Sequence, residues 1–63
     1  MTNLMRQRRE ELGLTQKELA ERLQMSETYI NKIENETRNI SVVLAIRIAT
    51  ALETKVEEIF FIN

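Results

Sequence analysis

Cysteine, histidine and proline are absent from this 63-residue chain, and glycine occurs once. Without cysteine or histidine the chain has no disulfides, no thiol chemistry, none of the usual zinc ligands and no imidazole to act as a general base. We therefore expect no enzyme activity, no metal site and no cofactor. The near absence of glycine and proline leaves few helix breakers, which favours a helical fold.

Long apolar segments are also missing. No run approaches the roughly 20 residues of a transmembrane helix, and the first ten residues carry three arginines without the apolar stretch of a signal peptide. We therefore expect a cytoplasmic protein. Hydrophobic residues make up 43% of the chain, which is enough for one small core. We expect residues 1–63 to form a single domain of marginal stability, because so short a chain buries only about 60% of its unfolded surface.

The balance of charge argues against a nucleic-acid partner. Nine basic and ten acidic residues give a formal net charge of -1, whereas nucleic-acid-binding domains are often strongly basic. Contact with phosphate depends, however, on where lysine and arginine lie rather than on their sum. The placement of the basic residues therefore decides the question.

Hydrophobic spacing and capping residues divide the first half of the chain into three short helices. The first ends near Leu12, where Gly13 follows as a C-cap. Thr15 and Glu18 have the spacing of a capping box, which predicts the start of the second helix. Ser26 offers the cap of a third helix, which we expect to run through residue 35.

Two more helices are predicted in the second half. Ser41 can cap a fourth helix, which is apolar almost all round. The segment Thr54-Lys55-Val56-Glu57 has the pattern of another capping box, which predicts a short fifth helix. The expected fold class is therefore all-α, with five short helices.

The second and third predicted helices follow one another after about three residues, as in a helix-turn-helix. The sequence there contains Leu14-Thr15-Gln16-Lys17-Glu18-Leu19-Ala20-Glu21-Arg22-Leu23, then Met25-Ser26, Tyr29-Ile30 and Ile33-Glu34-Asn35. With these residues the chain resembles the Cro and phage-repressor-like (XRE-type) helix-turn-helix family, over about residues 3–60. The resemblance implies a lambda-repressor-like DNA-binding domain, encoded by a bacterium or a phage and associated with the nucleoid, whose third helix enters the major groove.

The resemblance also implies base contacts by four residues of the third helix: Glu27, Thr28, Asn31 and Lys32. Lysine can donate to guanine O6 and N7, glutamate can accept from cytosine N4, and the threonine methyl can pack on a thymine methyl. The alternative is that these residues form an ordinary solvated helix face.

Phosphate contacts are implied for five further residues: Gln16, Lys17, Tyr29, Thr37 and Arg38. Gln16 begins the second helix, and a helix N-terminus suits an anion. Tyr29 could instead pack against the second helix. We expect Arg6 and Arg8 to be surface charges.

Arg9 and Glu34 match a structural pair of the phage-repressor branch, in which an arginine of the first helix bridges a glutamate at the end of the third. The resemblance therefore implies that both belong to the scaffold rather than to the DNA contacts. A bidentate pair of this kind is strong when it is partly buried.

Two positions depart from the family pattern. Gln24 lies where the turn before the third helix commonly has glycine, and Glu36 lies where Asn-Gly usually ends that helix. A residue other than glycine is strained at positive φ, so we expect either altered turns or a modest penalty. The charge of Glu36 should also weaken sequence-independent affinity for DNA.

The apolar excess of the C-terminal half predicts a homodimer, with Val43, Leu44, Phe61 and Ile62 in the interface and residues 59–63 reaching it. The alternative is that Phe61 and Ile62 fold back over the core as a lid. As a whole the sequence predicts a homodimeric regulator, a repressor in particular, that binds double-stranded DNA at a palindromic operator without a small-molecule ligand. The other hypothesis is a protein-interaction module, or an antitoxin-like partner binder, that uses the same fold.

Overall fold

A computed structural model describes residues 2–36 and 40–61 of the chain. Within these residues the elements are, in order, β1 (Thr2–Asn3), α1 (Met5–Glu11), α2 (Gln16–Leu23), α3 (Glu27–Asn35), α4 (Val42–Ala51), α5 (Val56–Ile59) and β2 (Phe60–Phe61). The expected all-helical class, with a helix-turn-helix at α2 and α3, is confirmed. The two short strands were not predicted. No helix in the described part of the chain is long and apolar enough to cross a membrane.

Three of the predicted helix starts are confirmed. The Thr15 hydroxyl accepts from the Glu18 amide at 3.0 Å, and the Glu18 carboxylate accepts from the Thr15 amide at 2.9 Å, which completes the capping box before α2. Ser26 and Ser41 each accept from the amide three residues further on, at 3.1 and 3.0 Å. Each of these caps satisfies an amide that the helix leaves without a partner, which typically contributes about 1 kcal/mol.

The second predicted capping box is wrong. The N-cap of α5 is Lys55, whose side chain makes no capping hydrogen bond. The Thr54 hydroxyl donates instead to the Glu58 carboxylate. The helix begins one residue later than the pattern suggested, at Val56, and the turn before it contains Glu53 with a positive φ of 57°.

The two departures from the family pattern have different outcomes. Gln24 adopts the left-handed conformation, with φ 57° and ψ 45°, so the turn between α2 and α3 is kept without glycine. Its amide donates to the Glu21 carbonyl at 3.2 Å, which closes the last turn of α2. Glu36 has extended backbone, with φ -148° and ψ 94°, so the chain leaves α3 without a left-handed residue at this position.

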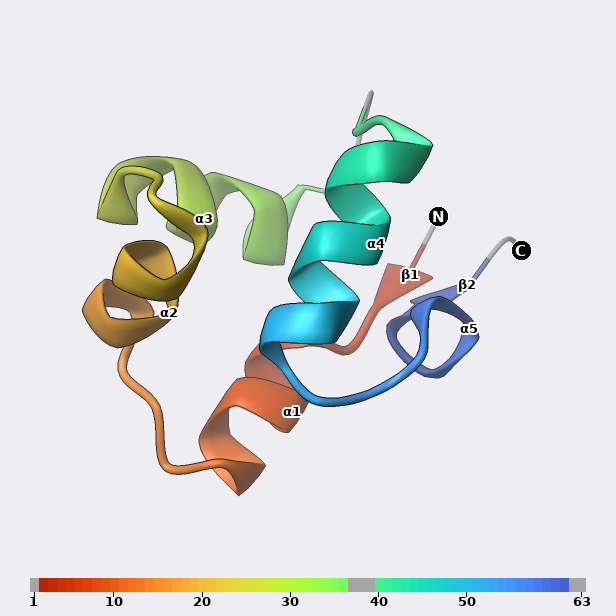
Figure 1. The fold of residues 1–63 in the computed structure, drawn as a ribbon, viewed down its shortest axis with the longest axis horizontal. Coiled ribbons are helices and arrows are strands. Elements are labelled where there is room, and N and C mark those ends of the chain that lie inside the picture. The colour runs from red at the N-terminus through yellow and green to blue at the C-terminus, as the bar shows by residue number, and fades with distance from the viewer. Residues whose placement is uncertain (1, 37–39, 62–63) are drawn as a thin grey trace.

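All five helices contribute to the core. Figure 1 shows α2 and α3 together on one side of the molecule, with α4 between them and the two chain ends. The buried hydrophobic residues are Met5, Leu19, Ala20, Leu23, Ile30, Ile33, Ala45, Ile48, Ala49, Leu52, Ile59 and Phe60. One face of α2 and one face of α3 pack into this core. Their opposite faces are therefore exposed to solvent, and the two exposed faces have a fixed orientation relative to each other.

The two strands join the N-terminal segment to α5. They pair antiparallel, with Asn3 opposite Phe60. The Asn3 side chain donates to the Ile33 carbonyl near the end of α3 at 3.0 Å and accepts from the Met5 amide at the start of α1 at 3.1 Å. This one asparagine therefore fixes the end of α3 relative to α1.

Replacing Gln24 by glycine should stabilise the protein, because glycine adopts the left-handed conformation without a Cβ penalty of about 1–2 kcal/mol. The greater freedom of glycine in the unfolded chain offsets part of this gain, so we expect a net increase of about 0.5–1 kcal/mol in the free energy of unfolding. Urea unfolding measures the change. Glu21→Gly, inside α2, is the matched control and should lower the stability by about 1 kcal/mol. A lower stability of Gln24→Gly would contradict the prediction.

Candidate nucleic-acid interface

Exposed polar side chains line α3 on the side that faces away from the core. They are the residues for which base contacts were predicted: Glu27, Thr28, Asn31 and Lys32. On the other side of the same helix, Ile30 and Ile33 are buried. Helical periodicity thus separates a packing face from a solvent face, and the predicted base-reading residues are all accessible.

The N-terminus of α2 lies beside this face. Gln16, the first residue of α2, lines one open hollow of about 260 Å³ together with Glu27, Thr28 and Asn31. The Asn31 side chain donates to Gln16 Oε1 across the hollow, at 3.5 Å. The structure therefore brings a predicted phosphate contact and three predicted base contacts to one surface.

The other residues with predicted DNA contacts do not line this hollow or lie outside the described residues. Lys17, Tyr29 and Lys32 are exposed but do not line this hollow, and Tyr29 keeps 40% of its surface in solvent. Thr37, Arg38 and Ile62 lie outside the described residues, and for Phe61 only the backbone is described. The roles of these residues stay predictions.

Behind this surface, Arg9 of α1 contacts Glu34 of α3. Arg9 Nε lies 2.7 Å from Glu34 Oε2, and Arg9 Nη2 lies 3.4 Å from Glu34 Oε1. The two side chains are only 11% and 0% exposed. Arg9 Nη1 also donates to the Leu14 carbonyl at 2.7 Å. The two residues predicted to pair are thus in direct contact, and one guanidinium joins α1, α3 and the connection to α2.

The Glu34 carboxylate receives two further donors. Gln16 Nε2 donates to it at 3.0 Å and Arg6 Nε at 3.4 Å. Burial opposes ionisation of this carboxyl, but the hydrogen bonds from Arg9 and Gln16 and the charge of Arg9 outweigh it and lower the pKa of Glu34 below its ordinary value. Glu34 is therefore charged at neutral pH, and it holds one N–H of the Gln16 amide.

Arg6 and Asn35 belong to this site, although the sequence pattern did not indicate them. Arg6 Nη2 donates to Asn35 Oδ1 at 3.0 Å, and Asn35 Nδ2 donates to Asn31 Oδ1 at 3.2 Å. Arg6 is exposed, as expected of a surface charge, but its contacts with Glu34 and Asn35 were not predicted. The sequence spacing could have indicated both residues. Arg6 lies three residues before Arg9 and Asn35 lies four residues after Asn31, so the two members of each pair share a helix face.

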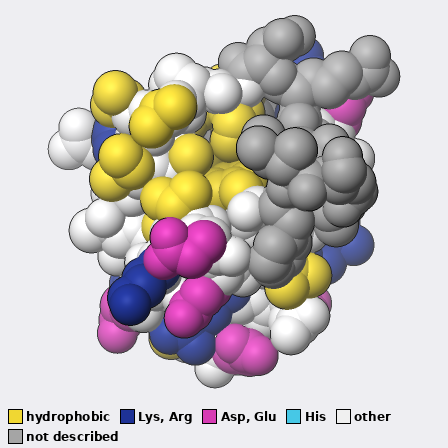
Figure 2. All heavy atoms as spheres, turned by 90° about the vertical axis from the view of Figure 1, so that its right-hand side faces the viewer, with side chains coloured by type: hydrophobic (Ala, Val, Ile, Leu, Met, Phe, Trp, Pro, Cys, Tyr) yellow, Lys and Arg dark blue, Asp and Glu magenta, His cyan; other side chains and the backbone are white. Residues whose placement is uncertain are grey.

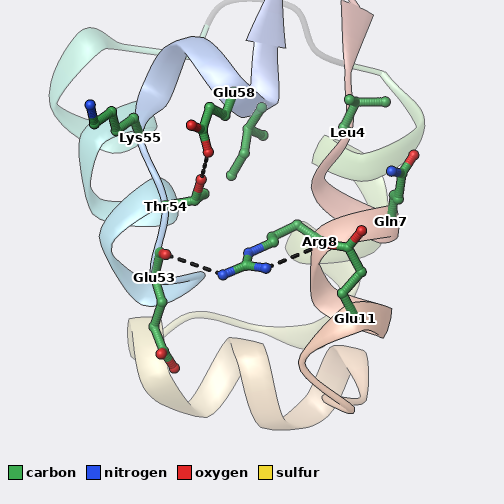
Figure 3. A pocket seen from close by; sticks show the side chains of 9 residues that line it. Leu4, Gln7, Arg8, Glu11, Glu53, Thr54, Lys55 and Glu58 are labelled. Atoms are coloured by element: carbon green, nitrogen blue, oxygen red, sulfur yellow. Dashed lines mark hydrogen bonds and ion pairs between the residues drawn. The ribbon is translucent and has the colours of Figure 1, made fainter.

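A second hollow, of about 400 Å³, shares no lining residue with the first (Figure 3). The Arg8 side chain crosses it and donates to the Leu52 carbonyl at 2.9 Å and to the Glu53 carbonyl at 3.2 Å. The end of α4 leaves such carbonyls without helical partners, so Arg8 acts as a cap for that end. Arg8 is therefore a structural residue rather than a free surface charge.

Comparison with known proteins identifies the class. The helix-turn-helix family matches residues 5–59 of the chain. The chain is 44% identical over 64 residues to an uncharacterized HTH-type transcriptional regulator from Methanothermobacter thermautotrophicus, across 100% of this chain and 93% of that relative. Its fold is similar to that of the restriction-modification controller protein C.AhdI from Aeromonas hydrophila, with a TM-score of 0.79 and 34% identity over 89% of this chain and 85% of that one. The chain therefore belongs to the helix-turn-helix family of DNA-binding transcriptional regulators.

Replacing Glu34 by glutamine should change how stability depends on pH. Because the folded state lowers the pKa of Glu34, the ionised carboxylate stabilises the fold above the unfolded pKa of about 4.3, and this contribution is lost as the pH falls through the lowered value. At pH 7 we expect Glu34→Gln to lose roughly 3 kcal/mol, because Arg9 then lacks its counter-charge. Below pH 4 the difference from wild type should shrink.

Urea unfolding between pH 7 and pH 3 measures both effects. Glu57→Gln, which removes an exposed carboxylate of α5, is the control and should stay close to wild type throughout. A difference between Glu34→Gln and wild type that stays constant over this pH range would show that Glu34 is not the group responsible.

Proposed function

We propose that this protein is a sequence-specific regulator that binds double-stranded DNA as a homodimer and represses by occupying a palindromic operator. The observation that carries the proposal is the single surface on which Gln16 of α2 meets the exposed residues at the start of α3. Membership of the helix-turn-helix family supports the same function. In this arrangement the second helix of the motif lies in the major groove and its N-terminal residues contact base edges.

The side chains on α3 are suited to reading bases. Lys32 can donate to guanine O6 and N7, Glu27 can accept from cytosine N4, and Asn31 can make two hydrogen bonds to adenine. Thr28 adds a methyl group for contact with thymine. These four residues differ in the base they favour, so together they can specify a sequence rather than a general shape.

Phosphate contacts would position α3 without adding sequence information. The N-terminus of α2 presents amides beside the exposed Lys17, and a helix N-terminus is favourable for a phosphate. The family resemblance adds Tyr29, Thr37 and Arg38 to this group. Because few charges are engaged, we expect weak binding to non-specific DNA and a shallow dependence of affinity on salt.

The proposed dimer interface lies on α4. Val42, Val43 and Ile46 are 75%, 68% and 50% exposed, which is unusual for three apolar residues of adjacent helical turns. Leu44 keeps less surface free, because it packs partly against the core. On the side where the chain ends lie, Figure 2 shows hydrophobic side chains gathered in one area, with charged side chains below it. Pairing of two copies through Val42, Val43 and Ile46 would bury these side chains. Recognition of a palindromic operator would require the two copies of α3 to lie about 34 Å apart, one helical turn of DNA.

Lys32→Ala should lower affinity selectively at one base pair. We expect a loss of about 1–3 kcal/mol on the preferred duplex and a much smaller loss on a shuffled duplex of the same composition. Gln16→Ala, which removes a proposed phosphate contact, should instead weaken binding to both duplexes. Fluorescence anisotropy titrations measure the affinities, with Lys55→Ala, an exposed lysine at the start of α5, as the control. Equal losses on both duplexes for Lys32→Ala would remove Lys32 from the base contacts.

Val43→Glu should shift the protein from dimer to monomer. An uncompensated charge in the interface should raise the dimer dissociation constant about tenfold or more. Light scattering over a range of protein concentrations measures the mass. Gln7→Glu adds the same charge on exposed α1 and should leave the mass unchanged. If Val43→Glu and Ile46→Glu both keep the wild-type mass at every concentration, α4 is not the interface.

A further inference from the structure

Five side chains of α1, α2 and α3 form a closed ring of hydrogen bonds, which we name the polar ring: Arg6, Gln16, Asn31, Glu34 and Asn35. Arg6 donates to Glu34 at 3.4 Å and to Asn35 Oδ1 at 3.0 Å. Asn35 Nδ2 donates to Asn31 Oδ1 at 3.2 Å. Asn31 Nδ2 donates to Gln16 Oε1 at 3.5 Å, the longest contact of the ring. Gln16 Nε2 closes the ring by donating to Glu34 at 3.0 Å.

The two ionic members and the Asn31 main-chain carbonyl, which accepts from Asn35 Nδ2 at 2.9 Å, set the direction of the bonds in the polar ring. A carboxylate can only accept, so Glu34 takes an N–H of Gln16 and leaves Gln16 Oε1 to face Asn31. A guanidinium can only donate, so Arg6 takes Asn35 Oδ1 and leaves the Asn35 amino group to face Asn31. Both sides therefore require the same orientation of the Asn31 amide, and neighbouring hydrogen bonds of this kind strengthen one another.

Asn31 keeps free hydrogen-bonding capacity on the exposed side. Its amino group has two hydrogens and its carbonyl two lone pairs, and the polar ring uses one of each. Because the amino group faces Gln16 and the carbonyl oxygen faces Asn35, the order of the remaining donor and acceptor along the surface is fixed. Adenine presents N7, an acceptor, next to the N6 amino donor, and an asparagine of fixed orientation matches this pair in one order only.

We infer that Arg6 and Asn35 are positioning residues, which act through the polar ring to hold Asn31 in the orientation that favours adenine at one position of the operator. This inference rests on the proposed function. It adds two residues to base recognition that need not touch a base themselves. It also gives the Gln16 side chain a role in orienting Asn31, beside any contact with phosphate.

Asn35→Asp tests the inference. The aspartate would accept from both Arg6 and Asn31, which draws the Asn31 amino group away from Gln16 and turns the amide. In competition titrations with duplexes that differ at one base pair, we expect the preference for adenine at that position to fall about tenfold. Gln7→Glu, which adds the same charge to α1 outside the ring, should keep the wild-type preference. Asn35→Asp loses the bond from Asn35 Nδ2 to the Asn31 carbonyl and adds a negative charge near the C-terminus of α3, so we expect a somewhat lower urea midpoint. The titrations are therefore made where urea unfolding shows that the variant is fully folded.

Side-chain amide NMR of the protein without DNA gives an independent readout. In the wild type the Asn31 amino protons should show contacts to the Gln16 side chain, and these contacts should be lost in Asn35→Asp. An unchanged adenine preference in Asn35→Asp would overturn the inference while leaving DNA recognition by α3 intact. A wild-type protein that binds every duplex equally would overturn the proposed function, and the inference with it.

Discussion

The buried pair of Arg9 and Glu34 is the contact on which the other features of this structure depend. It joins α1 to α3, and through the Leu14 carbonyl it also fixes the connection to α2. Both charges are removed from water, so the loss of either would leave the other uncompensated in a domain with little stability in reserve. Together with the packing of α2 and α3 in the core, this pair sets the position of α3 relative to the start of α2, and with it the geometry of the proposed DNA surface.

The distribution of the basic side chains explains how a chain with a net charge of -1 can belong to a DNA-binding family. In the described part of the chain, each arginine donates to a protein acceptor: Arg6, Arg8, Arg9, Arg22 and Arg47. The lysines of the helix-turn-helix, Lys17 and Lys32, are left exposed. Arginine therefore serves the scaffold, because its planar fork suits carbonyls and carboxylates. Such a protein should gain little from non-specific attraction and, on the proposed function, would depend on matched base contacts.

Local features were the ones that the sequence predicted well. The caps at Thr15 and Ser26 depend only on residues within one helical turn, so spacing was enough. The box at Thr54 failed because Glu58, just outside the pattern, takes the threonine hydroxyl. Helical spacing places Asn31 and Asn35 on one face, but it does not show the contacts of the polar ring between residues 15 to 29 positions apart. The family resemblance indicated Asn31 as a base contact, but the orientation of its amide could be inferred only from the structure.

Selection from a pool of randomised duplexes at low salt, followed by sequencing, tests most directly whether α3 reads DNA. We predict enrichment of a two-fold symmetric site whose half-sites lie about one helical turn apart. Each half-site should contain a fixed adenine and a fixed guanine, as expected for asparagine and lysine on one helix face. A pool that remains random after repeated selection would contradict recognition of DNA sequence by this surface and would favour a protein partner instead.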